Sequence, residues 1–482
     1  MNRIALLLRI CFLASLAACW TMVNVLPVAT AADDAELTKQ AAAAMRKAVQ
    51  FFRDEVACEG GYLWRYSEDL SLREGEGEAK PTTVWVQPPG TPIVGLALLR
   101  AYEATGDQYY LDAAVETAHC LVRGQLRSGG WEYRIEFDPK DRKRYAYRTD
   151  LPGEKQRNTT TLDDDNTQSA IRFLMQLDLA LKRKDPKIRE AVDYALTKLL
   201  AAQYPNGAWP QRFDEPVRIG TSPTKRASYP ETWSRTFPKE GYYGFYTFND
   251  GAMFDVIELF FEAARLYGDE RYREAARRGA DFILLSQMPD PQPAWAQQYD
   301  LDMQPAWARK FEPPSITGGE SQGAIRALLG AFRETGDRKY LEPIPAALAY
   351  LRASLLPDGK LARFYELKTN KPLYFTRDYV LTYDDSDMPT HYAFKVSSSL
   401  DSIEKLYERY AAGDVPKPTS DGDKPKPPSA SNVRSVIEKL DAKGRWLEEG
   451  QMKTDPEGKK RQTISTRTFA NNLRVLSDYL AQ

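Results

Sequence analysis

The sequence predicts an all-α fold in which repeated helix pairs form an (α/α) toroid or incomplete barrel, with long cleft-forming loops on one side. One observation is a helix-pair motif that recurs three times along the 482 residues. A second is that the turns inside each pair are short, whereas the loops after the pairs are long and rich in Trp, Tyr, Asp and Arg. Long loops on one side of a helical array indicate a binding cleft.

The repeated motif is an amphipathic apolar run that ends in Gly, followed by Asp and then by a second run. Gly suits the left-handed conformation that closes a helix, and Asp caps the helix that starts behind it. The pattern therefore predicts an αα-hairpin at each copy, and the copies lie at residues 101–111, 264–272 and 332–341.

A second motif, Q-x-x-x-G-x-W, is predicted to close the second helix of a pair. It occurs at residues 125–131 and 203–209, with a weaker echo at 356–359. The repeating unit is therefore helix, tight turn, helix and Gly-containing loop. The long loops of the predicted cleft side span residues 204–248, 289–315 and 363–394.

Composition and charge exclude several classes of function. Hydrophobic residues are 43% and charged residues 28% of the chain, values of a soluble globular protein. Lys and Arg number 66 against 67 Asp and Glu, so there is no global basic field and we expect no nucleic-acid partner. His119 and His391 are the only histidines, which excludes an H-E-x-x-H zinc site and makes any Ser-His-Asp triad depend on one of them. Carboxylates, Arg, Lys or Tyr are left to carry chemistry.

Residues 1–32 predict a signal peptide for export. Basic Arg3 and Arg9 precede apolar stretches rich in small residues, and an A-x-A-type cleavage site ends near Ala31. A lipoprotein processing box at Cys19 is the alternative, but a further apolar run follows it, and we favour simple cleavage. No later stretch reaches 18 consecutive apolar residues, so we expect no membrane span, and we expect a monomer.

The mature chain is predicted to have three parts. Residues 33–412 form the toroid, 413–432 a Pro- and Lys-rich linker or disordered loop, and 433–482 a helical extension that packs on the toroid. Two cysteines, Cys58 and Cys120, remain after cleavage; they either pair in an oxidising compartment or are two separate buried thiols.

The densest acidic spot is Asp163, Asp164 and Asp165, just before an amphipathic run that starts at Ile171. One of these carboxylates is expected to cap the helix, but three exceed what capping needs. Oxygen ligands of this kind suit Ca²⁺ or Mg²⁺, so a hard-cation site is the functional alternative to a capped helix.

Three further spots carry polar residues in the long loops. Asn249 and Asp250 open an apolar helix, where either is also a plausible N-cap. Arg309 and Lys310 form a basic spot, and Arg363 opens the last one. Arginine fits planar carboxylate recognition, and several cations opposite a Ca²⁺ site would suit a polyanionic sugar acid, although each charge alone is more often a solvated surface group.

Five segments together resemble the pectate lyases of polysaccharide lyase family ten, over about residues 41–396. They read TLD at 161–163, QYPNGAWPQ at 203–211, TFND at 247–250, PAWARKFEPP at 305–314 and ARFYEL at 362–367. The resemblance implies an (α/α)₃ toroid that cleaves polygalacturonate or pectin by Ca²⁺-assisted anti β-elimination, with an arginine as the Brønsted base. The products would be 4,5-unsaturated oligogalacturonates.

Roles are carried over motif by motif. Asp163 and Asp250 resemble the carboxylates that hold Ca²⁺ or orient substrate, and Arg377 resembles the base that takes the C5 proton. Lys310 and Arg363 resemble binders of substrate carboxylates. The expected substrate-binding set is Asp163, Asp164, Asn249, Arg309, Lys310, Arg363 and Trp209, with core packing as the alternative for Trp209.

Two departures from the family pattern bear on the site. Asp164 stands where the family is expected to have Asn, which adds a possible Ca²⁺ ligand. The loop from residue 217 to 243 is longer than in compact members, which would narrow the cleft.

Other functions fit parts of the pattern. A glycoside hydrolase on the same toroid would use two carboxylates, and Asp163 with Asp250 could supply them. A non-catalytic binding protein for acidic polysaccharide is a further alternative. A triterpene cyclase shares the toroid and the Q-x-x-x-G-x-W motif, but polar, Arg-rich loops suit a hydrophobic polyene badly.

Overall fold

The computed structural model describes residues 31–215, 224–418 and 427–482. The predicted signal peptide lies almost wholly outside these residues, and so does the middle of the predicted linker. The α-helices are α1 Ala31–Phe51, α2 Thr91–Thr105, α3 Gln108–Gly124, α4 Pro139–Arg142, α5 Asn166–Ala180, α6 Pro186–Ala201, α7 Ala252–Tyr267, α8 Glu270–Ser286, α9 Gly318–Thr335, α10 Ile344–Ala353, α11 Leu400–Ala411, α12 Ala430–Glu438 and α13 Thr466–Leu480.

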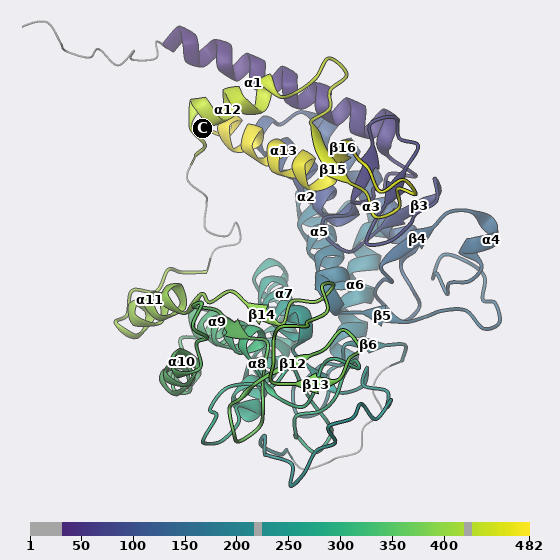
Figure 1. Ribbon diagram of the computed structural model, residues 1–482. Coiled ribbons are helices and arrows are strands. Elements are labelled where there is room, and N and C mark those ends of the chain that lie inside the picture. The colour runs from purple at the N-terminus through teal and green to yellow at the C-terminus, as the bar shows by residue number, and fades with distance from the viewer. Residues whose placement is uncertain (1–30, 216–223, 419–426) are drawn as a thin grey trace, which may run out of the picture.

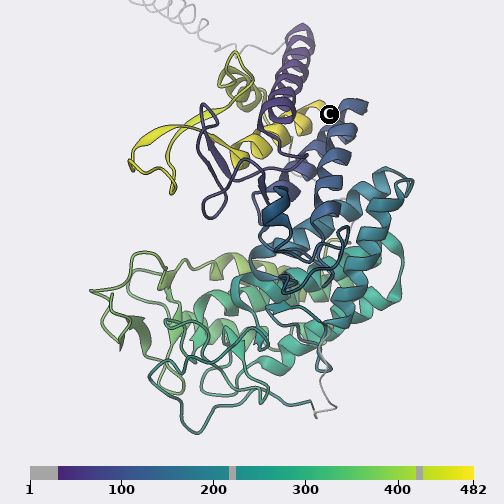
Figure 2. The ribbon, with the colours of Figure 1, turned by 90° about the vertical axis from the view of Figure 1, so that its right-hand side faces the viewer.

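The helices form two layers of an open array. The inner helices pack side by side in the order α13, α2, α5, α7, α9 and α11, and the outer helices α3, α6, α8 and α10 each pack on the inner helix before them. Figures 1 and 2 show α11 at one end of the arc and α1, α12 and α13 at the other. The predicted all-α fold is confirmed, in its incomplete-barrel form.

The two ends of the described chain meet at one end of the arc. Helix α13 lies against both α1 and α2, and α12 packs on α1 and α13 (Figure 1). The rings of Phe52 and Phe469 stack with centroids 3.6 Å apart. The segment after residue 432 also holds two strands that the sequence did not predict, and one of them pairs with a strand near the N-terminus.

The Gly-Asp turns have the predicted geometry. Gly106, Gly268 and Gly336 close α2, α7 and α9 with φ of 69°, 69° and 71°. The following Asp side chain accepts a backbone N–H two residues on in each case. A fourth turn joins α5 to α6, where Asp185 caps α6 in the same way but Lys182 and Arg183 take the positive φ in place of Gly. Without a glycine, this copy escaped detection in the sequence.

The Q-x-x-x-G-x-W motif fastens neighbouring pairs to one another. The Nε2 of Gln125 donates to the carbonyls of Gly129 and Ala191, and the Nε2 of Gln203 donates to those of Gly207 and Ala275. Each glutamine thus ties its own loop to the next outer helix. The loop carbonyls of Gly129 and Gly207 gain a hydrogen-bond donor in this way.

Short antiparallel strands fix the places where the inner helices begin. Two-stranded ladders pair β3 with β4, β5 with β6, β7 with β8 and β10 with β14; two sheets run in the orders β13-β12-β11-β9 and β15-β16-β1-β2. The strands are β1 Arg65–Ser67, β2 Arg73–Glu74, β3 Thr83–Trp85, β4 Arg134–Glu136, β5 Thr160–Thr161, β6 Arg212–Phe213, β7 Tyr246–Thr247, β8 Gln298–Tyr299, β9 Ile316–Thr317, β10 Leu361–Ala362, β11 Phe364–Tyr365, β12 Pro372–Phe375, β13 Leu381–Thr382, β14 Lys395–Val396, β15 Leu447–Gln451 and β16 Lys460–Ser465.

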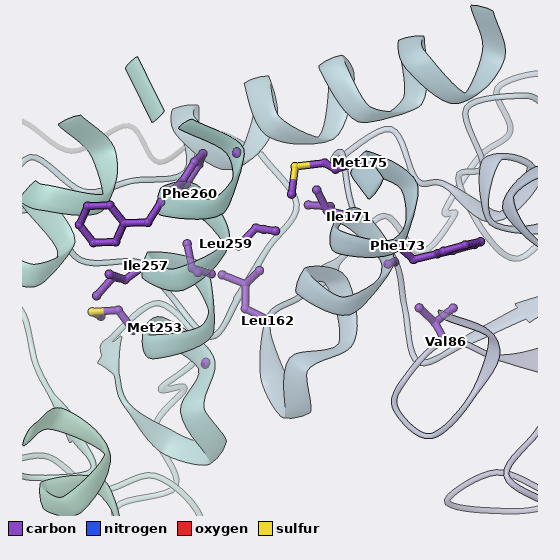
Figure 3. Packing of buried hydrophobic residues seen from close by; sticks show 14 of the residues in the cluster. Val86, Leu162, Ile171, Phe173, Met175, Met253, Ile257, Leu259 and Phe260 are labelled. Atoms are coloured by element: carbon purple, nitrogen blue, oxygen red, sulfur yellow. The ribbon is translucent and has the colours of Figure 1, made fainter. Parts of the chain in front are cut away.

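The apolar core lies between adjacent inner helices and under the long loops. Figure 3 shows Leu162, from the turn before α5, between Ile171 of α5 and Ile257 of α7. The long loops share a smaller aromatic cluster that contains Trp307, Phe364 and Phe375. No described helix is both long enough and apolar enough to cross a bilayer.

Candidate active site

Two tight turns at the starts of α5 and α7 lie against each other. Each follows a two-residue strand and is a short 3-10 helix, Asp163–Asp165 before α5 and Asn249–Gly251 before α7. Asp164 and Asp250 hold the left-handed conformation, with φ of 53° and 48°. That conformation costs a non-glycine residue energy and tends to be kept where a site requires it.

The turns bring three carboxylates together. One oxygen from each of Asp163, Asp164 and Asp250 lies within 4.8 Å of the others. Asp163 is buried, Asp164 is half-buried and Asp250 is exposed, so the cluster opens from the interior towards solvent. The sequence had placed Asp163 and Asp250 at one site, and the structure brings them together with Asp164.

Burial and mutual repulsion both disfavour the charged forms of Asp164 and Asp250. Burial, together with the charges of Asp163 and Asp250, raises the pKa of Asp164 to about 7, although a hydrogen bond from the Gln87 amide opposes the rise. Burial and the Asp163 charge likewise raise the pKa of Asp250, and the charges of Arg309 and Arg363 oppose it. The site therefore favours a bound cation or proton over three free anions.

Two oxygens at the turns also have no hydrogen-bond partner. The Oδ1 atoms of Asp163 and Asn249 are buried and unpaired, which is costly for a carboxylate or an amide. The other oxygen of Asp163 accepts from the Tyr133 hydroxyl at 2.8 Å, and the Asn249 amide donates to Asp250 at 2.7 Å. Carboxylate and amide oxygens gathered in this way fit a hard cation such as Ca²⁺.

Basic residues from two long loops face this cluster. Arg309 pairs with Glu312, which also accepts from the Tyr392 hydroxyl at 2.8 Å. The Arg363 guanidinium lies 4.6 Å from the centroid of the Tyr392 ring, and its Nη1 is 3.9 Å from buried Glu320. Both arginines lie near enough for their charges to lower the pKa of Asp250. Two arginines therefore lie within electrostatic range of the carboxylate cluster.

Two other predicted residues lie elsewhere on the loops. The Arg377 side chain is 70% exposed, and its Nε is 3.3 Å from Asp387. Lys310 points at the Tyr379 ring, with Nζ 3.4 Å from the centroid. Among the described residues, the hydrogen bond and ion pair found for Arg377 are both with Asp387 and not with the carboxylate cluster.

The predicted substrate contact of Trp209 is wrong. Its side chain is 1% exposed, and the indole N–H donates to the carbonyl of Leu199 in α6. Trp131 and Trp295 make the equivalent bond to the outer helix before them. The tryptophan of the Q-x-x-x-G-x-W motif is therefore a packing residue.

Sequence reasoning missed the side chains that support the carboxylates. The Gln87 amide donates to Asp164 at 2.8 Å, and Arg212 lies 3.7 Å from Asp163 while donating to the Tyr133 hydroxyl. Gln87 comes from the loop before α2, and Tyr133 from the loop before β4. Arg212 follows Trp209 by three residues, as Arg134 follows Trp131, and this was the one signal available.

A cavity of about 410 Å³ lies between α7, α9 and α11. Its lining includes Gly251 and Asp255, just behind the Asp250 turn, together with Phe254 and Leu406. Asp163, Asp164 and Asp250 are not among the lining residues. The carboxylate cluster therefore lies outside this cavity, next to its Gly251 end.

Comparison with known proteins supports the resemblance. Residues 137–361, a little under half of the chain, match the family model described as pectic acid lyase. The matched segment contains the three clustered carboxylates, Arg309 and Lys310, and it ends just before Arg363. The match confirms the predicted resemblance to pectate lyases and the predicted class of enzyme, a polysaccharide lyase. Among curated proteins, none matches the chain.

Several solved structures are similar to this one. A family 10 polysaccharide lyase from Cellvibrio cellulosa is 24% identical, with a TM-score of 0.45, over 66% of this chain and 95% of its own. A mutant of that lyase in complex with trigalacturonic acid is 22% identical, with a TM-score of 0.44, over 67% and 98%. A cellobiose 2-epimerase from Bacillus thermoamylovorans is 13% identical, with a TM-score of 0.46, over 94% and 99%.

The raised pKa of Asp164 predicts a stability gain from Asp164→Asn. A carboxyl with a pKa near 7 in the folded state and 3.8 in the unfolded state stabilises the fold only while it is protonated, so this contribution is lost as pH rises through 7. At pH 8 in chelator, the variant should be more stable than wild type by about 1–2 kcal/mol in denaturant unfolding. At pH 5 the difference should shrink.

Added Ca²⁺ should reverse the order at pH 8, because the wild-type carboxylate then gains a counter-ion. A variant that is less stable than wild type at pH 8 without Ca²⁺ would contradict the electrostatic account of the cluster.

Proposed function

We propose that this chain is a pectate lyase that cleaves α-1,4-linked polygalacturonate by Ca²⁺-assisted anti β-elimination. The observation that carries the proposal is the cluster of three mutually repelling carboxylates with two unpaired buried oxygens, opposed by Arg309 and Arg363. A cation at the carboxylates and guanidinium groups opposite them suit a polymer that carries one carboxylate on each sugar. Export through residues 1–32 belongs to the same proposal, because pectate is an extracellular polymer.

Asp163, Asp164 and Asp250 would hold the cation, with the side-chain Oδ1 of Asn249 as a further ligand. When bound, Ca²⁺ supplies positive charge that attracts the uronate carboxylate and stabilises the negative charge that develops on it. Tyr133 and Gln87 keep Asp163 and Asp164 in place through their hydrogen bonds. Such supporting bonds hold the first set of ligands in a fixed orientation.

Elimination needs a base at C5 and a leaving oxygen at C4. The C5 proton is acidic because it is α to the carboxylate, and its removal forms the C4–C5 double bond as the C4–O bond breaks. The departing oxygen takes a proton from solvent. Guanidinium donors near the same carboxylate lower the barrier because they are already in position as charge develops.

We infer the identity of the base from the positions of the arginines. The resemblance assigned it to Arg377, which in this structure is exposed and paired with Asp387. Arg309 and Arg363 both lower the pKa of Asp250 by their charge, and of the two Arg309 has the more accessible side chain, 42% exposed against 17%. We therefore assign the base to Arg309, with Arg363 and Lys310 as binders of substrate carboxylates.

Arg309 must lose a proton to act in this role. Its ion pair with Glu312 raises its pKa, so the paired form is protonated. Glu312 has a second partner in the Tyr392 hydroxyl, to which it can remain bonded when substrate separates it from Arg309. Positive charge from the cation and from Arg363 then disfavours the charged form of Arg309.

Purified protein with polygalacturonate at alkaline pH tests the activity. Absorbance from the new C4–C5 double bond should rise in the presence of Ca²⁺ and stay flat in chelator. New reducing ends without that absorbance would indicate a hydrolase that uses two carboxylates. Polymer binding without either product would indicate a non-catalytic binding protein.

Alanine variants of three arginines separate base from binder. Arg309→Ala should lower kcat by about 10²- to 10⁴-fold, the usual contribution of a general base. Arg363→Ala should mainly raise KM, and Arg377→Ala should change kcat less than about threefold. Loss of kcat in Arg377→Ala with polymer binding retained would contradict our assignment and favour the base that the resemblance implied.

A further inference from the structure

The segment from residue 224 to 245 is anchored over the aromatic cluster of the long loops. The rings of Trp233 and Phe237 lie 6.4 and 5.8 Å from that of Trp307. The Trp307 indole N–H donates to the carbonyl of Ser234 at 2.8 Å. Arg235 forms an ion pair with buried Glu366. The middle of the segment is therefore held by packing, a hydrogen bond and an ion pair.

The segment ends in a tight turn directly before β7, the strand that leads to Asp250. The N–H of Phe245 donates to the carbonyl of Tyr242 at 2.8 Å, which closes the turn. The hydroxyl of Tyr204 donates to the carbonyl of Gly244 and fixes the turn to the body of the protein. Tyr243 is thus held at the tip of an anchored turn.

Tyr242 and Tyr243 connect the two sides of the candidate active site. Their ring centroids are 4.5 Å apart. Tyr242 lies near Arg309 and Glu312, whose charges act on it. The Tyr243 ring lies 4.8 Å from the guanidinium of Arg212, the residue 3.7 Å from Asp163. Tyr243 is 45% exposed, so its side chain is accessible to a ligand.

We propose that Tyr243 determines substrate specificity, as a platform on which one uronate ring of the polymer stacks next to the cleavage position. The apolar C–H face of a pyranose ring matches an exposed phenol ring, which is large, rigid and apolar on its faces. The adjacent Arg212 guanidinium, which lies 4.8 Å from the Tyr243 ring and has a side chain that is 29% exposed, binds the carboxylate of the same sugar. The proposal rests on the proposed function for the identity of the sugar.

The platform explains what the long segment does. The segment is anchored at residues 233–237. Near its end it presents one exposed tyrosine, Tyr243, against Arg212. A substrate oligomer that is long enough to reach Tyr243 gains a stacking contact, whereas a shorter oligomer does not. The segment therefore makes the enzyme sensitive to substrate length.

Kinetics on a series of oligogalacturonates of increasing length test this with Tyr243→Ala and Tyr243→Phe. Wild type should gain kcat/KM at one chain length, and Tyr243→Ala should lack that gain, by about tenfold and mostly through KM. Tyr243→Phe keeps the ring and should stay within about twofold of wild type. Equal loss at all lengths, or equal loss in both variants, would overturn the platform.

A matched control is Tyr109→Ala on outer helix α3. Like Tyr243, Tyr109 has its ring against an arginine, with the centroid 3.4 Å from the guanidinium of Arg46 in α1. It should leave kcat/KM unchanged at every length. Melting temperatures of all three variants report any loss of fold.

Binding to polygalacturonate in chelator, measured by affinity electrophoresis, separates this proposal from the lyase proposal. Tyr243→Ala should bind about tenfold more weakly and Tyr243→Phe as wild type. If wild type shows no elimination but this pattern of binding holds, the proposed lyase activity fails and the platform stands. Equal binding by wild type and Tyr243→Ala would overturn the platform whatever the activity.

Discussion

Mutual repulsion among three carboxylates is the constraint on which the rest of the site depends. Two unit charges at the separation found here repel by about 3 kcal/mol at an effective dielectric constant of about 20. Asp164 and Asp250 also adopt left-handed backbone conformations, which add strain. This arrangement is consistent with our proposal that the carboxylates bind a cation and that the cation and the nearby arginines attract a polyanion.

The helical array supplies the rigidity that holds these charges together. Inner helices α5 and α7 are packed side by side, and Leu162 is buried between them just ahead of Asp163 (Figure 3). Glutamines such as Gln203 fasten each loop to the next pair. The two turns therefore cannot separate to relieve repulsion without disrupting the core. The long loops, packed on their own aromatic cluster, then bring Arg309 and Arg363 to face the carboxylates.

The sequence predicted the array and the carboxylates for physical reasons that are local. Gly336 and Asp337 mark a helix end and a helix start within two residues, and a run such as Asp163 to Asp165 exceeds what a helix cap needs. Loop contacts between distant residues were not predictable. Arg377 was assigned by the family resemblance, but its place depends on how the loop after β12 folds. Trp209 was misassigned because one aromatic residue can serve either a core or a sugar, and only its burial decides.

Calcium titration by calorimetry at pH 8 tests the central claim most directly. The account predicts one saturable site per chain in wild type, weakened at least about tenfold by Asp250→Asn, because each lost carboxylate removes a ligand and a charge. Asp401→Asn, which changes an 85% exposed aspartate on α11, should bind as wild type. No saturable binding, or equal binding by wild type and Asp250→Asn, would contradict a cation site at the three carboxylates.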